Sequence, residues 1–191
     1  MSRKKVSKTI SFTLVILLIF LGINSYQHYQ NEKQQWENFI RHFYSTIDRA
    51  HNRIDLLIEK RPTDEALSQV IRELEIEFIK ANEIVISGNS YVDDDIYNTF
   101  FFRRVPSLLN GLKMTGTLTA EIQPLAEDNQ LDEAEVAILQ VIKDCLTKAK
   151  QAIYSEGENG PNLDLTVAEL NDVLKTYLLK DIPEIYNESR S

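Results

Sequence analysis

The sequence predicts an all-α protein in which an N-terminal transmembrane helix continues into an antiparallel bundle of four to five helices. Three observations lead to this fold class. An uncharged apolar run lies near the N-terminus, apolar residues follow heptad spacing over most of the remaining chain, and no sustained two-residue alternation indicates β-strands. With six Gly, five Pro and one Cys in 191 residues, a disulfide scaffold and a low-complexity chain are both excluded.

The predicted membrane segment covers residues 9–29. No charged side chain occurs in residues 9–31, and residues 10–23 are apolar except for Ser11, Thr13 and Gly22. From residue 9 to Tyr26 the run has 18 residues. As a helix it covers about 27 Å, which is close to the roughly 30 Å hydrocarbon core of a bilayer. The run is therefore long enough to span a membrane.

Basic residues set the predicted orientation of this segment. Residues 1–8 contain Arg3, Lys4, Lys5 and Lys8 and no acidic residue. The positive-inside rule then makes residues 1–8 a short cytoplasmic tail and residues 30–191 an extracytoplasmic all-helical domain of a single-pass protein in the cell membrane. A cleaved signal peptide begins in the same way, but no small-residue cleavage site follows, which favours an uncleaved signal anchor. A secreted, cleaved chain and a soluble chain with a buried first helix are the alternatives.

The charge of the outer part is strongly negative. The four basic residues at the N-terminus leave 17 basic residues against 29 acidic ones from Gln27 onward, a balance of −12. A field of this sign repels phosphate backbones, so we expect no nucleic-acid partner.

Two long helices are predicted first in the outer part. Trp36, Ile40, Phe43, Ile47, Ala50, Ile54 and Leu57 alternate spacings of four and three, and no Gly or Pro interrupts residues 24–60, so the membrane helix is expected to continue into this one. Pro62 ends it. A second helix follows with the seam Leu67, Ile71, Leu74, Phe78, Ala81 and Val85, and Gly88 is expected to terminate it.

The middle of the chain has a weaker pattern. Asp93 is a candidate N-cap for a helix that holds Ile96 and the aromatic residues after it, and Pro106 is expected to kink that helix. A shorter helical segment is expected over residues 119–126.

The C-terminal part predicts two further helices. One runs from Asp132 to about Ser155, with apolar residues at heptad spacing, and stops at the loop of residues 156–161. The other begins after Thr166, which with Glu169 forms a capping box, and is expected to end near Asp181 and Pro183.

Residues 100–104, Phe100-Phe101-Phe102-Arg103-Arg104, are the candidate contact site for a ligand or partner. Three consecutive aromatic residues on a helix cannot all face one core, so at least one is expected to meet another helix, a partner or lipid. Arg103 and Arg104 could bind a carboxylate or phosphate bidentately. The alternative is a central helix buried on two sides, with both Arg residues at its rim.

Two acidic groups resemble metal sites only in part. Asp48 and His51 form half of a di-metal bundle motif, but no second such motif exists, so Asp48, His51, Asp55 and Glu59 are interpreted as a solvent-facing stripe with i,i+4 pairs. Asp93, Asp94 and Asp95 lack the spacing of a calcium loop and are interpreted as acids at a helix N-terminus, with weak surface calcium binding as the alternative. We expect no metal site.

No catalytic or cofactor motif appears in the sequence. There is no nucleophile elbow and no Gly-rich phosphate loop, and Cys145 follows an apolar seam, where a lone Cys usually packs as a small apolar residue. We therefore expect a protein that is not an enzyme and needs no cofactor. The leading hypothesis is an accessory or scaffold subunit of an envelope protein complex, with a protein partner in the membrane or envelope. The alternative is an extracytoplasmic, sensor-like module for a small anionic or amphipathic molecule.

Overall fold

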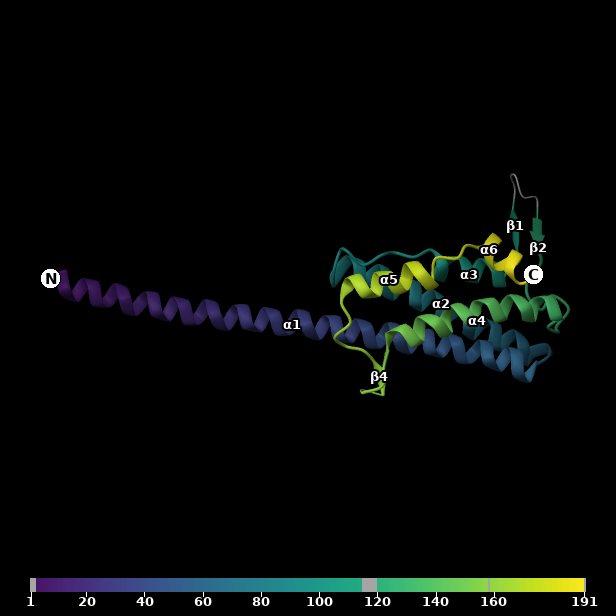
Figure 1. The fold of residues 1–191 in the computed structure, drawn as a ribbon, viewed down its shortest axis with the longest axis horizontal. Coiled ribbons are helices and arrows are strands. Elements are labelled where there is room, and N and C mark those ends of the chain that lie inside the picture. The colour runs from purple at the N-terminus through teal and green to yellow at the C-terminus, as the bar shows by residue number, and fades with distance from the viewer. Residues whose placement is uncertain (1–2, 115–119, 158, 191) are drawn as a thin grey trace. The chain divides into compact units, whose positions relative to one another are not determined.

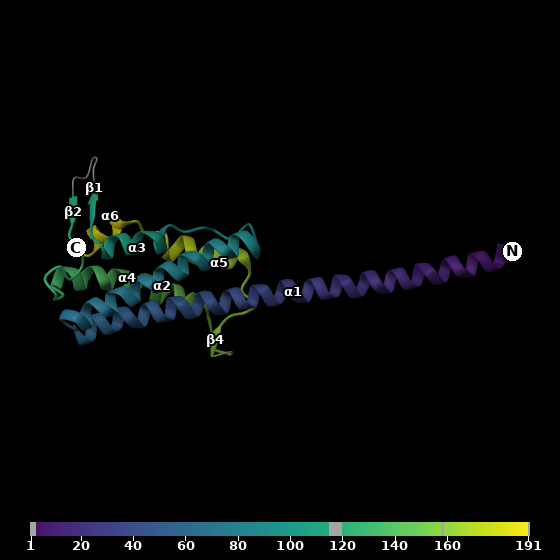
Figure 2. The same cartoon turned by 180° about the vertical axis from the view of Figure 1, so that it is seen from behind.

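The computed structural model describes the backbone of residues 3–114, 120–157 and 159–190, and the side chains of residues 17–111, 123–157 and 159–190. The chain divides into two units, Met1–Asn38 and Phe39–Ser191. Along the described chain the elements are α1 Arg3–Lys60, α2 Asp64–Tyr91, α3 Phe101–Leu109, β1 Leu112–Met114, β2 Ala120–Ile122, α4 Glu133–Ile153, β3 Tyr154–Ser155, β4 Gly160–Pro161, α5 Val167–Tyr177 and α6 Ile182–Glu188 (Figures 1 and 2). The expected all-helical bundle is confirmed.

The prediction of a membrane-spanning segment is not supported by the described residues. Among the residues whose side chains are described, no helix has both the length and the apolar character needed to cross a bilayer. The predicted tail of residues 1–8 and the first part of the predicted segment, residues 9–16, lie outside those residues. The backbone of α1 is one continuous helix from Arg3 to Lys60, as the lack of Gly and Pro in residues 24–60 predicted.

The two long apolar seams form the core of the second unit. The buried members on α1 are Ile40, Phe43, Ile47, Ala50, Ile54 and Leu57, and those on α2 are Leu67, Leu74, Phe78, Ala81 and Val85. Two ion pairs show that α2 runs antiparallel to α1, since Arg49 contacts Glu77 at 2.8 Å and Arg53 contacts Glu73 at 2.9 Å. The turn at Pro62 falls where the sequence predicted it.

The predicted end of α2 at Gly88 is wrong, because the helix continues to Tyr91. Gly88 is buried inside the helix against the ring of Phe39. A Cβ at this position would lie 3.0 Å from Phe39 Cζ and closer still to two other ring atoms. Glycine is therefore needed for close packing of α1 and α2 and does not mark the helix end.

The middle of the chain differs most from the prediction. Asp93 caps no helix, because the chain after α2 forms turns and α3 begins only at Phe101. Side-chain amides hold these turns: Asn89 donates to the carbonyls of Asp94 and Ile96, and the Asn171 amide oxygen accepts from Tyr97 N–H at 2.7 Å. Pro106 lies within α3 and does not end it.

Two short hairpins were not predicted. β1 pairs antiparallel with β2, with Leu112 opposite Ile122, so the helical segment expected over residues 119–126 is wrong over the described residues 120–126; residue 119 lies outside them. β3 pairs with β4 across the loop that follows α4. Strands of two or three residues are too short to show the two-residue period on which strand prediction depends. The hairpins lie toward opposite ends of the bundle (Figure 1).

The C-terminal helices begin with three capping boxes, of which the sequence predicted the one at Thr166. Asp132 begins α4 and Thr166 begins α5, each with the reciprocal bonds of a capping box. Asp181 and Glu184 form a third capping box that begins α6, with Pro183 in its first turn. Pro183 was interpreted as the end of a helix, but proline is also common at the first position of a helix. The described ranges thus contain six helices in place of four to five.

Candidate functional site

The aromatic run of residues 100–104 is divided between core and surface. Phe101 and Phe102 are both 1% exposed. The Phe102 ring meets Phe43 edge to face, with centroids 5.7 Å apart. The Phe78 ring packs against Phe101 at 6.1 Å and against Phe102 at 6.3 Å. This four-ring cluster joins α3 to α1 and α2, so these two side chains serve the fold.

The other three residues of the run lie at the surface. Phe100 is 54% exposed, and the Arg103 guanidinium stacks on its ring at 4.9 Å from the centroid. Arg104 Nε lies 3.7 Å from Asp181 Oδ1. Aromatic and arginine side chains together are typical of interface positions that contribute strongly to binding. We refer to Phe100, Arg103 and Arg104 as the α3 patch.

The C-terminal segment borders the α3 patch. The Thr99 hydroxyl donates to the carbonyl of Leu178, and Arg104 reaches Asp181. Leu179, in the chain between these two contacts, is 49% exposed and adds an apolar side chain near the patch. The patch is therefore built by α3 and the link between α5 and α6, a combination that sequence spacing alone did not reveal.

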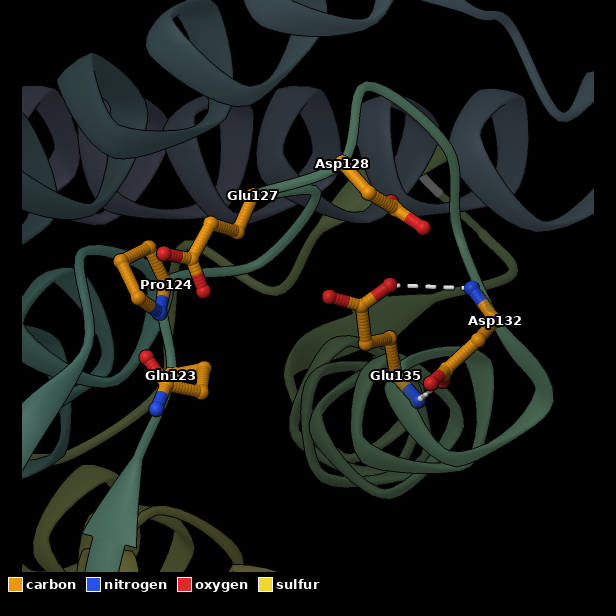
Figure 3. Close-up of a pocket in the computed structure, with 6 residues that line it drawn as sticks. All are labelled: Gln123, Pro124, Glu127, Asp128, Asp132 and Glu135. Atoms are coloured by element: carbon orange, nitrogen blue, oxygen red, sulfur yellow. Dashed lines mark hydrogen bonds between the residues drawn. The ribbon is translucent and has the colours of Figure 1, made fainter.

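A cavity lined mainly by acidic residues lies elsewhere in the described part of the chain. It measures about 340 Å³ and is lined by Gln123, Pro124, Glu127, Asp128, Asp132 and Glu135 (Figure 3). Glu135 is occupied by structural bonds, since it accepts from the backbone N–H of Ala126 at 2.7 Å and of Asp132 at 2.9 Å. The acids here shape the turn before α4, and this cavity is not lined by the α3 patch.

The aspartates at 93–95 lie in the turn after α2, not at the helix N-terminus that the sequence analysis expected. Their carboxylate oxygens lie within 4.8 Å of one another, and Asp93 Oδ1 accepts from Asp95 N–H at 2.9 Å. Asp94 and Asp95 are exposed. The described contacts account for the group as a local turn motif.

Three members of the predicted solvent-facing stripe on α1, Asp48, His51 and Asp55, instead contact α4, while Glu59 is exposed as predicted. Asp48 pairs with Lys150 and Asp55 with Lys143, both at 2.5 Å, and His51 Nε2 lies 3.0 Å from the Thr147 hydroxyl. We call these six residues the α1–α4 polar row. The predicted i,i+4 contact of His51 with Asp55 is present at 3.3 Å, but solvent exposure was wrong, because the His51 side chain is only 14% exposed.

Part of the polar row resembles a nucleophilic triad in its order of groups. Asp55, His51 and Thr147 place a carboxylate, an imidazole and a hydroxyl in sequence. A hydrolase also needs a substrate cavity and oxyanion donors beside the hydroxyl. The cavity shown in Figure 3 is not lined by these residues, and Thr147 lies within α4, where backbone N–H groups bond inside the helix. The geometry accounts for the row as a device that sets helix register.

Burial shifts the pKa of both His51 and Cys145. Desolvation lowers the pKa of His51, and Lys150 lowers it further, so the ring is neutral at pH 7. Desolvation also raises the pKa of Cys145, which keeps the buried thiol protonated and unreactive. This agrees with the interpretation of Cys145 as a small apolar residue.

A further surface was missed by the sequence analysis. Three isoleucines on the outer face of α2, Ile76, Ile79 and Ile86, are 42 to 43% exposed. Together with Arg72 and Glu83 they follow the spacing four, three, four, three, a second heptad seam parallel to the buried one. We call these five residues the α2 stripe. The signal was present in the sequence, but the stronger core seam on the same helix concealed it.

Comparison of the chain with known proteins finds no matching protein family, no matching protein of curated function and no matching solved structure. The functional conclusion therefore depends on the residues themselves.

Proposed function

We propose that the chain is a membrane-anchored extracytoplasmic helical bundle that acts by binding, as an accessory or scaffold subunit of an envelope protein complex. In this proposal residues 1–8 lie in the cytoplasm, residues 9–29 form the anchor, and residues 30–191 face outward. The partner is another protein of the membrane or envelope.

One observation supports the proposal that residues 9–29 form a membrane anchor. The described part of the uncharged run exposes large apolar side chains on every side of α1, each at least half exposed: Leu17, Leu18, Ile19, Phe20, Leu21 and Ile23. A helix that is apolar all round is stable only in a protein core or in lipid. Lipid accounts for these exposed apolar side chains better than a protein core does, because four basic residues precede the run, as they do in a signal anchor.

The α3 patch is the proposed contact for the protein partner. Its exposed aromatic ring is already held by Arg103, so little side-chain freedom is lost on binding. Asp181 draws Arg104 to the same surface. An acidic or amphipathic segment of a partner would match this combination of an apolar ring and two guanidinium groups.

The alternative is a ligand-binding module for a small anionic or amphipathic molecule, held by the same patch. The guanidinium groups favour it. The burial of Phe101 and Phe102 in the four-ring cluster disfavours it, because it leaves one aromatic ring of the run at the surface to cover a ligand.

The test is crosslinking and affinity capture of the membrane-extracted full-length chain, followed by mass spectrometry, beside a chain that starts at Gln27. Capture of one defined membrane complex, with crosslinks that map to the α3 patch, is the expected result. A double variant Phe100→Ala, Arg103→Glu should lose that complex. A matched control, Tyr91→Ala with Arg41→Glu, changes an exposed aromatic residue and an exposed arginine elsewhere and should retain it. A monomer that captures nothing reproducibly would exclude the accessory-subunit function.

A further inference from the structure

The α2 stripe is an apolar surface that the fold leaves uncovered. Glu73 and Glu77 on one side of α2 contact α1, and Glu75 on the other side bonds Asn110 after α3. The stripe lies between these two packed sides. Its three isoleucines are exposed, and within the described residues no hydrogen bond or ion pair is recorded for the side chains of Arg72 and Glu83.

The order of residues along the stripe is self-complementary. When two α2 helices lie antiparallel and cross at the midpoint of α2, between Glu77 and Phe78, Arg72 of one copy faces Glu83 of the other. The same alignment places Ile76 opposite Ile79. Each of these relations occurs twice, because the two copies are related by a two-fold axis.

The alignment also gives the longest possible overlap of the two α2 helices. Because its centre is the midpoint of Asp64–Tyr91, the two helices overlap along their whole length. A parallel, in-register pair would instead place Arg72 against Arg72 and Glu83 against Glu83, which is repulsive at both positions. Charge thus selects the antiparallel arrangement over the parallel one.

We infer that α2 is a self-association surface, on which a second copy of this chain packs antiparallel through Ile76 and Ile79, with Arg72 and Glu83 paired across the two-fold axis. This surface is separate from the α3 patch. The inference does not depend on the proposed function and concerns chains released from the membrane, because two chains held in the same direction by one bilayer do not form an antiparallel pair.

The inference has a geometric consequence within the bundle. Phe39 contacts Gly88 near the C-terminal end of α2, so the two copies of Phe39 lie at opposite ends of the paired helices. The association is therefore measured on full-length chains in detergent micelles, where no shared bilayer forces the two chains to point the same way.

The first experiment measures the mass of the full-length chain by analytical ultracentrifugation across a concentration series. The wild type should reach a dimer. Arg72→Glu and Glu83→Arg each replace two attractive pairs with two repulsive ones, so each should weaken the dimer by roughly tenfold or more. The combined variant Arg72→Glu, Glu83→Arg restores opposite charges and should recover the wild-type constant. Far-UV circular dichroism checks that each variant is folded.

The second experiment tests the register by disulfide trapping. A mixture of Ile76→Cys chains and Ile79→Cys chains should form a mixed disulfide faster than either chain alone, since these positions face each other only in the antiparallel pair. The native Cys145 is buried, so the chain without an added Cys is the background. A monomer at all concentrations, a dimer insensitive to both single charge reversals, or faster trapping within one variant alone would each overturn the inference.

Discussion

The charge state of His51 is tied to the fold. Its ring is enclosed between α1 and α4, faces Lys143 and Lys150 on α4, and has Asp48 and Asp55 on its own helix. Because burial lowers the pKa of His51 in the folded chain, the unfolded chain binds a proton more readily below its ordinary pKa of about 6.5. Protonation therefore favours unfolding.

This sign gives a pH prediction. As the pH falls below about 6.5, the free energy of unfolding should decrease until the folded-state pKa of His51 is passed. His51→Gln cannot titrate and should lose less stability between pH 7.5 and pH 5. Urea unfolding of both chains at the two pH values measures the difference, and the comparison cancels the carboxylates that both chains share. Equal losses in the two chains would contradict the prediction.

Gly88 gives a second prediction at the residue scale. In an exposed helix Ala would be favoured over Gly by about 1 kcal/mol. At this position the methyl group would overlap the Phe39 ring, so Gly88→Ala should destabilise the bundle, by about 1 to 3 kcal/mol in thermal or urea unfolding. In a Phe39→Leu background, where the ring is absent, the same substitution should cost less. An undiminished cost there would point away from the ring contact.

At the scale of the element, α1 is held by polar contacts on two flanks. Arg49 and Arg53 pair with α2, while Asp48 and Asp55 pair with α4. A heptad seam alone permits neighbouring registers, because a shift of seven residues places apolar side chains opposite apolar side chains again. The charged rows remove this ambiguity, since each pairing occurs in one register.

The pair of Asp55 and Lys143 tests this role. Lys143→Ala leaves the partly buried Asp55 carboxylate without its ion pair. This variant should therefore destabilise the bundle more than the double variant in which both charged groups are removed. In a double-mutant cycle with Asp55→Ala, the coupling free energy should be at least about 0.5 kcal/mol. The exposed pair of Arg61 and Glu133 is the control, and its cycle should give a smaller coupling. Equal couplings would show that burial adds nothing at the polar row.

The sequence predicted the elements whose determinants are local. The seams of α1 and α2 repeat over many turns, and the capping box of Thr166 depends on a residue three positions away, so both were recognised. The capping box at Asp132 has the same spacing but was not predicted. The turn after α2 depends on Asn171, which lies 74 residues from Tyr97 in the chain. No local pattern could reveal such a contact, and the predicted helix start at Asp93 failed for that reason.

The candidate site was predictable only in part. The sequence analysis identified residues 100–104 as unusual, because three aromatic side chains in succession conflict with a single apolar face. Which of them would be buried depended on the position of Phe43 and Phe78 across the bundle, and that is a tertiary property. The α2 stripe could have been found from its spacing, but exposure, which distinguishes it from a core seam, required the structure.

At the scale of the whole molecule, the C-terminal helix closes the bundle over α4. Ile182 and Ile185 of α6 are buried, and α6 packs on α4. Lys180 and Glu188, at the two ends of this region, are close enough to influence the pKa of Cys145. We therefore expect this segment to cover the thiol.

Removal of this cover should expose Cys145. A chain that ends at Asp181 is expected to react with a thiol reagent at pH 7.5 without denaturant, while the full-length chain reacts only when unfolded. The rate of colour release with an aromatic disulfide reagent measures this directly. Variant Lys180→Ala in the full-length chain, which removes the Glu188 contact but retains α6, should stay unreactive. A shortened chain with an inaccessible thiol would show that other elements bury Cys145.

The ion pairs that α1 forms with α2 and with α4 also determine how the bundle responds to mechanical force. A pull along α1 at Phe39 would load the contacts to α2 and to α4 in shear, so that Arg49, Arg53, Asp48 and Asp55 carry the load at the same time. Contacts that peel apart one after another yield at lower force than contacts that must break together. Forced unfolding is governed by the rate of crossing the unfolding barrier. Because these ion pairs must break together, we expect α1 to resist being pulled away from the rest of the bundle.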